Sequence, residues 1–172
     1  NAGGTPAETR RLRRESWRAL ERAHALGVIR AIGVSNYEIE HIEELYAYAR
    51  VMPAVNQIEL HPYLQRRALR KYCASQGIAV QAYGSIAAGV ETRLLDDPVV
   101  RRVARRVGRD PGQVLLRWAL QHGVAVLPKS VTPARIKSNA ALFDFELDEG
   151  DMEALDGLEK GERTYWDNCG VP

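Results

Sequence analysis

Apolar runs alternate with amphipathic segments along the whole chain. Four short apolar runs are predicted as strands, at residues 30–36, 54–60, 78–83 and 124–127. Helical spacing of apolar residues follows each strand, and further helices are predicted at 8–26, 98–107, from 110 to about 122, and at 149–158. Strands that alternate with helices predict an α/β fold in which a parallel sheet is joined by right-handed crossovers.

The fourth strand and its helix form the most informative stretch. The run 124–127 stops at Pro128, which cannot donate a hydrogen bond to a central ladder. Thr132 is a good N-cap and Pro133 suits the first helical position, so a helix is expected to run from there through Leu142. A strand therefore ends, and a helix begins, within a few residues of each other.

Lys129, Ser130 and Val131 lie in this short connection, where unpaired N–H groups and the helix dipole favour an anion. Arg135 falls in the first helical turn, where the dipole disfavours a cation. An anion held by Lys129, Arg135 and the helix N-terminus would reconcile these charges. Alternatively, both cations simply point into water, and the stretch alone supports the two interpretations equally.

Length and composition favour one globular domain covering residues 1–172, with 1–7 as a loop and 163–172 as a C-terminal tail. The 172 residues are 45% hydrophobic, which suffices for a core, and no apolar run approaches the roughly 20 residues of a membrane span. Without an apolar N-terminal signal, a cytoplasmic location is expected. Cys73 and Cys169 are too distant in sequence to suggest a disulfide scaffold or a four-ligand zinc site.

The charge pattern gives little support for a nucleic-acid partner. The net charge is only +2. One helix, at 98–107, carries a basic face opposite an apolar stripe, and its basic residues are Arg101, Arg102, Arg105 and Arg106. Because no aromatic residues are interleaved with them, we interpret this face as solvated.

Polar residues recur where the predicted strands end. Ser35 and Asn36, Tyr83, and Lys129 with Ser130 all fall at C-terminal strand ends, the edge where α/β folds bind ligands. Gln57 and Glu59 instead interrupt the second strand, so they need partners in the inner layer of the sheet or a ligand. For Gln57 alone, a hydrogen-bonded core amide is the favoured interpretation.

Four segments, taken in order, resemble the aldo-keto reductases. They are IGVSNY at 32–37, NQIELHPY at 56–63, AYGS at 82–85 and LPKS at 127–130, the last followed by Arg135, Ile136 and Asn139. The resemblance implies an α/β fold of the (β/α)8 TIM-barrel family and the reduction of small-molecule carbonyls with NADPH.

Residue by residue, the resemblance implies a cofactor site. Ser35, Asn36 and Gln57 would bind the nicotinamide carboxamide, Tyr83 would stack on the ring, and Ser85 would lie near the pyrophosphate. The adenosine 2′-phosphate and adenine would be held by Lys129, Ser130, Thr132, Arg135 and Asn139. Residues 163–172, with Tyr165 and Trp166, are expected to contribute a wall of the substrate site. The alternative is that they form only a packed tail.

The resemblance covers only part of the family's barrel. A (β/α)8 barrel typically needs about 250 residues and eight strands. This chain supplies about the last four βα units, a C-terminal helix and a tail. The family's catalytic Asp, Tyr, Lys and His belong to the first half, and no counterparts are found, so no catalytic residue is expected here. His61 is expected to end its strand, and no metal site is expected, because the four histidines are scattered: His24, His41, His61 and His122.

A half-barrel leaves two sheet edges and an inner layer open, and that layer is expected to include Val34, Val55, Ile58 and Val126. Completion by the missing N-terminal half, another copy or another chain is therefore expected. Two functions follow from the pattern. The chain is the C-terminal half of an NADPH-dependent carbonyl reductase, inactive alone, or it is a non-catalytic half-barrel subunit for cofactor binding or assembly. Gly84, where the family usually has Ser, is a smaller departure.

Overall fold

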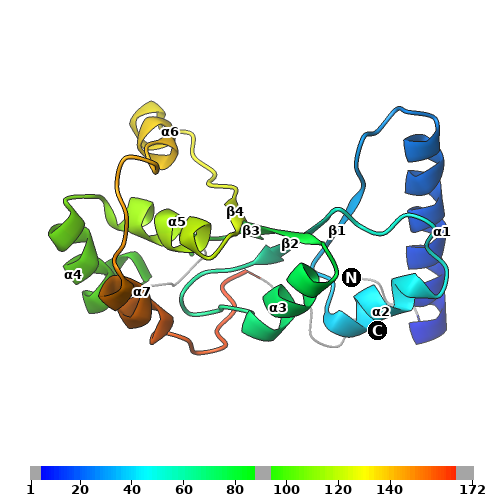
Figure 1. Ribbon diagram of the computed structural model, residues 1–172, viewed down its shortest axis with the longest axis horizontal. Coiled ribbons are helices and arrows are strands. Elements are labelled where there is room, and N and C mark those ends of the chain that lie inside the picture. The colour runs from blue at the N-terminus through cyan, green and yellow to red at the C-terminus, as the bar shows by residue number, and fades with distance from the viewer. Residues whose placement is uncertain (1–4, 88–93, 166–172) are drawn as a thin grey trace.

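The computed structural model describes residues 5–87 and 94–165 (Figure 1). Helices and strands alternate along this part of the chain, as the sequence predicts. In order, the elements are α1 (Pro6–Ala25), β1 (Gly33–Ser35), α2 (Ile39–Tyr46), β2 (Val55–Glu59), α3 (Arg67–Ser75), β3 (Ala79–Tyr83), the 3₁₀ helix η1 (Leu94–Asp96), α4 (Pro98–Val107), α5 (Pro111–Gln121), β4 (Ala125–Val126), α6 (Pro133–Ala140) and α7 (Glu149–Asp156).

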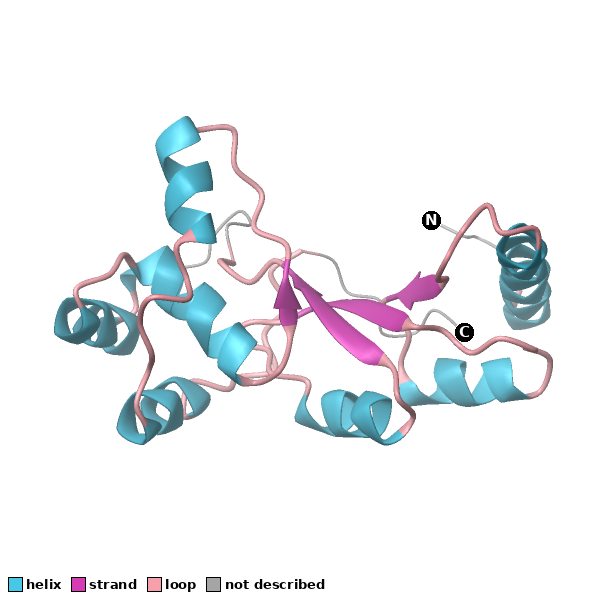
Figure 2. Ribbon diagram, turned by 45° about the horizontal axis from the view of Figure 1, so that its top comes forward, coloured by secondary structure: helices cyan, strands magenta, loops and turns pink. Residues whose placement is uncertain are grey.

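The four strands form one parallel sheet in the order β1-β2-β3-β4. Figure 2 shows them side by side at the centre of the molecule, with helices on one side and at both ends. The ladder extends slightly past the short β4, because Leu127 N donates to Ala82 O at 3.1 Å. All four strands therefore end at the same edge of the sheet, where the polar residues singled out in the sequence follow them.

The two faces of the sheet differ in chemistry. Register places Ser35, Gln57 and Gln81 in one row, and the next row, on the opposite face, contains Ile58, Ala82 and Val126. Ile58 and Ala82 are buried in the helix-covered core. The face turned away from that core is therefore the polar one.

This arrangement corrects the prediction for the inner layer. Of the four valine and isoleucine residues expected there, only Val55 shares a face with Gln57, since successive side chains of a strand alternate. Val34, Ile58 and Val126 lie on the helix-covered face, and Ile58 is only 2% exposed. The apolar residues of these strands anchor the helices, leaving polar side chains on the open face.

Two hydrophobic clusters hold the helices to the sheet. The larger one joins β2 and β3 to α3, α4, α5 and α7, with Leu69, Val103 and Leu155 among its buried members. The smaller one packs Trp17 of α1 against Ile32 and Leu45, and Trp17 Nε1 donates to Val51 O at 3.1 Å. Figure 1 shows α1 and α2 at one end of the molecule and α4 to α7 towards the other.

Several helix boundaries differ from the prediction for identifiable reasons. The first helix begins at Pro6, inside the predicted loop 1–7, because Thr5 Oγ1 accepts a hydrogen bond from Glu8 N. The helix expected to reach Leu142 ends at Ala140, and Gln113 Nε2 donates to two carbonyls at that end, Ser138 O and Ala141 O. The last helix begins at Glu149 as predicted, with Asp148 as its cap, but it ends at Asp156 and not at residue 158.

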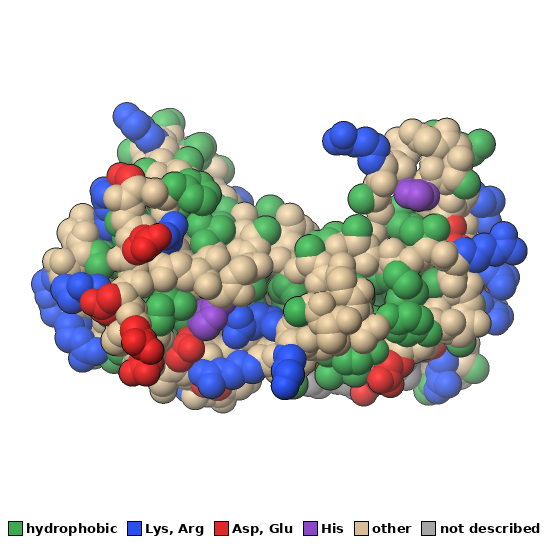
Figure 3. Space-filling model, in the orientation of Figure 1, with side chains coloured by type: hydrophobic (Ala, Val, Ile, Leu, Met, Phe, Trp, Pro, Cys, Tyr) green, Lys and Arg blue, Asp and Glu red, His purple; other side chains and the backbone are tan. Residues whose placement is uncertain are grey.

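The surface follows from this layout. Figure 3 shows the molecule hollowed between two raised ends, with lysines and arginines at both ends and along the lower side between them. Across residues 5–87 and 94–165, no helix combines the length and the apolarity that crossing a bilayer requires.

Candidate functional site

A cavity of about 620 Å³ opens where the loop after β4 meets the start of α5 and α6. Five residues predicted from sequence to form a site line it together: Lys129, Ser130, Thr132, Arg135 and Asn139. Other walls come from η1, α4 and the start of α5, and include Arg101, Asp110 and Gln113. The local stretch that suggested an anion is therefore part of one concave site.

Positive charge is available in this cavity. Lys129 and Arg135 are exposed, and neither side chain forms an ion pair or hydrogen bond with another residue of the described ranges. The nearby carboxylates are already engaged, because Asp96 pairs with Arg101 and Asp110 forms a capping box with Gln113. The N-terminus of α6 adds the positive end of a helix dipole. The cavity is therefore suited to an anion.

Thr132 occupies the N-cap position of α6, as predicted, but its side chain makes no capping hydrogen bond. Instead, Ser130 Oγ accepts from the backbone N–H of Thr132 at 3.1 Å. Thr132 therefore stands at the predicted N-cap position but does not make the capping hydrogen bond that is usual for threonine there. Its hydroxyl group and the N–H groups of the first helical turn can serve a ligand.

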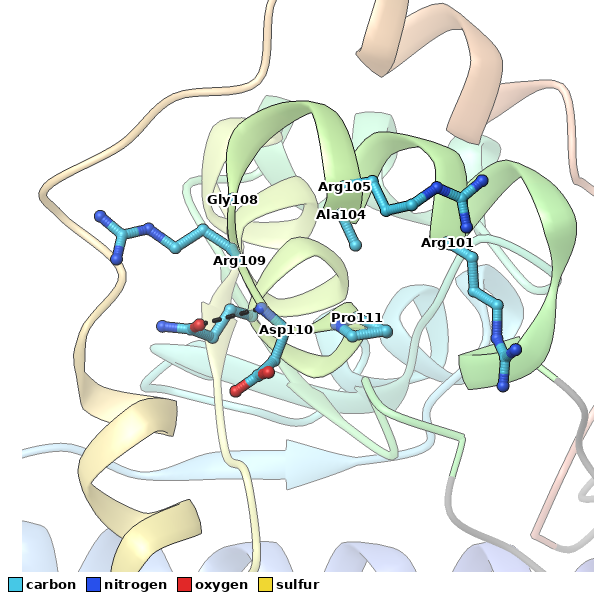
Figure 4. Close-up of a pocket in the computed structure, with 8 residues that line it drawn as sticks. Arg101, Ala104, Arg105, Gly108, Arg109, Asp110 and Pro111 are labelled. Atoms are coloured by element: carbon cyan, nitrogen blue, oxygen red, sulfur yellow. Dashed lines mark hydrogen bonds between the residues drawn. The ribbon is translucent and has the colours of Figure 1, made fainter.

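A neighbouring cavity of about 510 Å³, between the end of α4 and the start of α5, has a different character. Figure 4 shows the guanidinium groups of Arg101 and Arg109 extending in opposite directions. Arg101 pairs with Asp96, and Arg109 pairs with Asp144 at 2.9 Å. These arginines bind carboxylates of the chain instead of converging on a common point.

A second group of predicted site residues meets at the ends of β1, β2 and β3. Tyr83 Oη donates to Asn36 Oδ1 at 3.0 Å, Asn36 Nδ2 donates to Ser35 Oγ at 3.2 Å, and Ser35 Oγ donates to the carbonyl oxygen of Gln57 at 3.1 Å. Asn36 adopts a left-handed backbone conformation with φ of 58°, which asparagine tolerates well. Hydrogen bonds thus connect three of the strand ends.

Both polar residues that interrupt β2 have protein partners. Gln57 Nε2 donates to Gln81 Oε1 at 2.9 Å, so Gln57 is a hydrogen-bonded amide as expected. It is half-buried on the open face of the sheet, so its expected place in the core was wrong. Glu59 is 1% exposed, and its Oε1 lies 3.1 Å from His61 Nε2 and accepts from Thr164 N at 2.6 Å and Thr164 Oγ1 at 2.7 Å. Burial raises the pKa of Glu59, but the hydrogen bonds from His61 and Thr164 outweigh burial and lower it overall.

Two predicted site residues are not brought into these groups. Ser85 is buried, and its hydroxyl donates to Ala82 O at 3.4 Å. Trp166 lies outside the described residues. No set of three or more His, Cys, Asp or Glu side chains within the described ranges could hold a metal ion.

A sequence model of the aldo/keto reductase family matches residues 5–160. The chain belongs to this family. It is similar to glyoxal reductase of Bacillus subtilis, with 47% identity over 88% of this chain and 54% of that protein. It is also similar to 9,11-endoperoxide prostaglandin H2 reductase of Trypanosoma cruzi, with 39% identity over 89% of this chain and 54% of that protein.

Solved aldo-keto reductases share the fold. A member from a Medee basin deep-sea metagenome library matches with a TM-score of 0.86 and 33% identity, over 91% of this chain and 58% of that one. The aldo-keto reductase of the silkworm, Bombyx mori, matches with a TM-score of 0.82 and 36% identity, over 88% of this chain and 48% of that one. The four-stranded sheet is therefore a partial (β/α)8 barrel, and the chain spans about half the length of these relatives.

Sequence reasoning missed three side chains that organise the candidate site. Gln81 could have been found, because it precedes Tyr83 by two residues and so shares its face of β3. The position of Gln113 indicated only a capping box with Asp110, yet its Nε2 also donates to Ser138 O near the end of α6. Thr164 gave no local signal, since its partner Glu59 lies 105 positions away. His61 was expected only to end its strand, but it is fully buried beside Glu59.

The backbone and surroundings of Gly84 explain why glycine stands where the family usually has serine. Its φ is +67°, and a Cβ there would lie 2.6 Å from Cε2 of Tyr165. We expect Gly84→Ala to lower the free energy of unfolding by about 2 kcal/mol, since it adds a steric clash to an unfavourable left-handed conformation. Urea denaturation measures this loss.

Gly77→Ala is the matched control for Gly84→Ala. Gly77 has a φ of +69°, but a Cβ added there would meet no atom within 4 Å, so only the backbone cost of about 1 kcal/mol is expected. Equal losses in the two variants would show that Tyr165 moves aside without cost and would contradict a tight contact at Gly84.

Proposed function

We propose that this chain is the cofactor-binding, C-terminal half of an NADPH-dependent carbonyl reductase. The observation that carries the proposal is the cavity in which Lys129 and Arg135 are exposed and, within the described residues, unpaired beside the N-terminus of α6. An ammonium and a guanidinium group neutralise a dianionic phosphate, and the guanidinium can bind two of its oxygens at once. These residues fit the 2′-phosphate that distinguishes NADPH from NADH.

The remaining cavity residues fit the rest of the adenosine end. Ser130 and Thr132 offer hydroxyl groups to the same phosphate, and Asn139 offers an amide to the adenine. At the sheet, the polar groups of Ser35, Asn36 and Gln57 suit the nicotinamide carboxamide.

The nicotinamide ring itself needs a flat, apolar support. Tyr83 provides an aromatic face at the end of β3, with its hydroxyl group held by Asn36. Ser85, two residues further on, is assigned to the segment near the pyrophosphate. When bound, NADPH supplies the hydride. The role of this chain is to orient the ring that carries it and to hold the phosphate end.

We infer that the proton donor belongs to the half of the barrel that this chain does not provide. A carbonyl oxygen that accepts a hydride on its carbon also needs a proton from a positioned acid. The Asp, Tyr, Lys and His that do this work in the family have no counterparts in the motifs matched here. The substrate class is an aldehyde or ketone, which the similarity to a glyoxal reductase supports.

Closing the barrel would also complete the site. Within the described sheet, β1 and β4 are the two edge strands, and the face bearing Gln57 and Gln81 is turned away from the helices. Open strand edges and a polar inner face are suited to pairing with four more strands. The proposed partner is an N-terminal half-barrel.

A complementation assay tests this function. NADPH oxidation in the presence of glyoxal is measured with the purified chain, with the N-terminal half of Bacillus subtilis glyoxal reductase, and with both together. We expect the chain alone to bind NADPH without turnover, and the mixture to reduce glyoxal. Reduction by the chain alone would refute the assignment of the proton donor, and no NADPH binding would refute the site. Binding without turnover in the mixture would favour a non-catalytic subunit.

A further inference from the structure

The end of the described chain crosses the connection between β2 and α3. We call residues 159–165 the tail segment. The backbone N–H groups of Lys160 and Glu162 both donate to Tyr63 O, at 3.1 and 3.0 Å. Gln65 N donates to the side chain of Glu159 at 2.7 Å, and the Lys160 ammonium lies 3.5 Å from the centre of the Tyr63 ring. The tail segment is therefore fixed to this connection along its length.

Glu59 fixes the tail segment at its far end. Oε1 of this buried carboxylate accepts both the N–H and the hydroxyl group of Thr164, and His61 Nε2 contacts the same oxygen. Hydrogen bonds to a carboxylate are among the strongest in proteins, especially away from water. Glu59 points from the end of β2 on the same face as Gln57, so this contact lies at the ligand-binding edge of the sheet.

The position of Thr164 determines where the next residue lies. The ring of Tyr165 packs edge-on against the ring of Tyr83, with centroids 5.7 Å apart and planes at 76°. The approach is possible because Gly84 has no Cβ. Tyr83 is thus held at two places, by Asn36 at its hydroxyl group and by Tyr165 at its ring.

We propose that Glu59 is a positioning residue for the nicotinamide site. It acts through Thr164, which places Tyr165 against Tyr83 and thereby fixes the plane of the Tyr83 ring. This inference rests on the proposed function, in which Tyr83 stacks on the nicotinamide. A buried carboxylate that makes no contact with the cofactor would then control how well one end of NADPH binds, while the 2′-phosphate end is unaffected.

The test compares two ligands on the same 172-residue chain. NADPH uses both ends of the proposed site, whereas adenosine 2′,5′-bisphosphate carries the 2′-phosphate but has no nicotinamide. Thr164→Val removes one hydroxyl group that Glu59 binds, and Tyr165→Leu removes the ring contact. In calorimetric titrations, we expect each variant to weaken NADPH binding by about fivefold to tenfold and to change bisphosphate binding by less than about twofold.

Two further variants separate positioning from general damage. Thr164→Ser keeps the hydroxyl group and should bind NADPH as the unmodified chain does. The double variant Thr164→Val with Tyr165→Leu should be no weaker than the worse single variant, because both changes break one chain of contacts.

The outcomes distinguish the positioning role from the proposed function. Unchanged NADPH affinity in Thr164→Val and Tyr165→Leu, or equal losses for both ligands, would overturn the positioning role and leave the proposed function standing. Failure of the unmodified chain to bind the bisphosphate would overturn the proposed function, and the positioning role with it. Selective loss of NADPH affinity in Thr164→Val and Tyr165→Leu, with full affinity retained in Thr164→Ser, would support the role of Glu59.

Discussion

Replacing Arg135 with alanine is expected to weaken NADPH binding by about fiftyfold to a hundredfold, while NADH binding changes by less than about threefold. Arg135 lines the cavity beside the start of α6 and has no ion-pair partner in the described part of the chain. In the proposed complex its guanidinium group meets only the 2′-phosphate, which NADH lacks. Fluorescence titration with each dinucleotide measures the two affinities.

Lys137→Met is the matched control for Arg135→Ala. Lys137 is an exposed cation on the same helix, but it does not line the cavity, so both affinities should stay within about twofold of the unmodified chain. Lys129→Met should weaken NADPH binding as Arg135→Ala does. Arg135→Lys should have an NADPH affinity between those of the unmodified chain and Arg135→Ala, because lysine keeps the charge but lacks the planar guanidinium group. Equal losses of NADPH and NADH affinity in Arg135→Ala would refute the 2′-phosphate assignment.

Trp118→Ala is expected to lower the free energy of unfolding by about 4 kcal/mol. Trp118 has no exposed surface, and its Nε1 donates to Asp156 Oδ1 at 2.7 Å. The same oxygen lies 2.8 Å from His122 Nε2. The rings of Trp118 and His122 pack edge to face, with their centroids 4.8 Å apart. Truncation would leave a large void and remove a buried donor between α5 and α7. Urea denaturation followed by circular dichroism measures the change.

Trp118→Phe separates the two contributions of the tryptophan. It keeps most of the ring and removes the N–H group, so a loss of about 1 to 2 kcal/mol is expected. Leu26→Ala provides a surface control, because Leu26 is 80% exposed and should change stability by less than about 0.5 kcal/mol. A loss below about 1 kcal/mol for Trp118→Ala would show that α5 and α7 do not share a packed core.

The order of the elements could be predicted because it depends on local periodicity. The faces of the sheet could not, and β2 shows why. Its apolar residues Val55 and Ile58 are three positions apart and therefore lie on opposite faces. Asn56, a polar residue, is buried on the helix-covered face, where its Nδ2 donates to Tyr37 O at 2.9 Å. Polarity alone therefore did not reveal which side of this strand the helices cover.

The anion site at the start of α6 was indicated by the sequence, whereas the contacts around Glu59 at the sheet were not. Lys129, Thr132 and Arg135 belong to one continuous stretch, so helix caps and charges indicated an anion site there as one of two interpretations, and the structure places all three residues in one cavity. The contact between Glu59 and Thr164 joins positions 105 residues apart, and only the folded chain brings them together. The titrations with NADPH and NADH test whether the cavity binds the predicted cofactor.

α6 has one more consequence for the cavity it forms. None of its residues is buried, and Figure 1 shows it raised above α5. Its C-terminal end is tied to α5 by the amide of Gln113. Because α6 makes so little apolar contact, its own free energy of folding is small. An anion bound in the cavity would therefore supply much of the stability of this helix. Ligand affinity and the local folding equilibrium of α6 are therefore thermodynamically linked, so substitutions that raise helix propensity on its outer surface would tighten binding without touching the ligand.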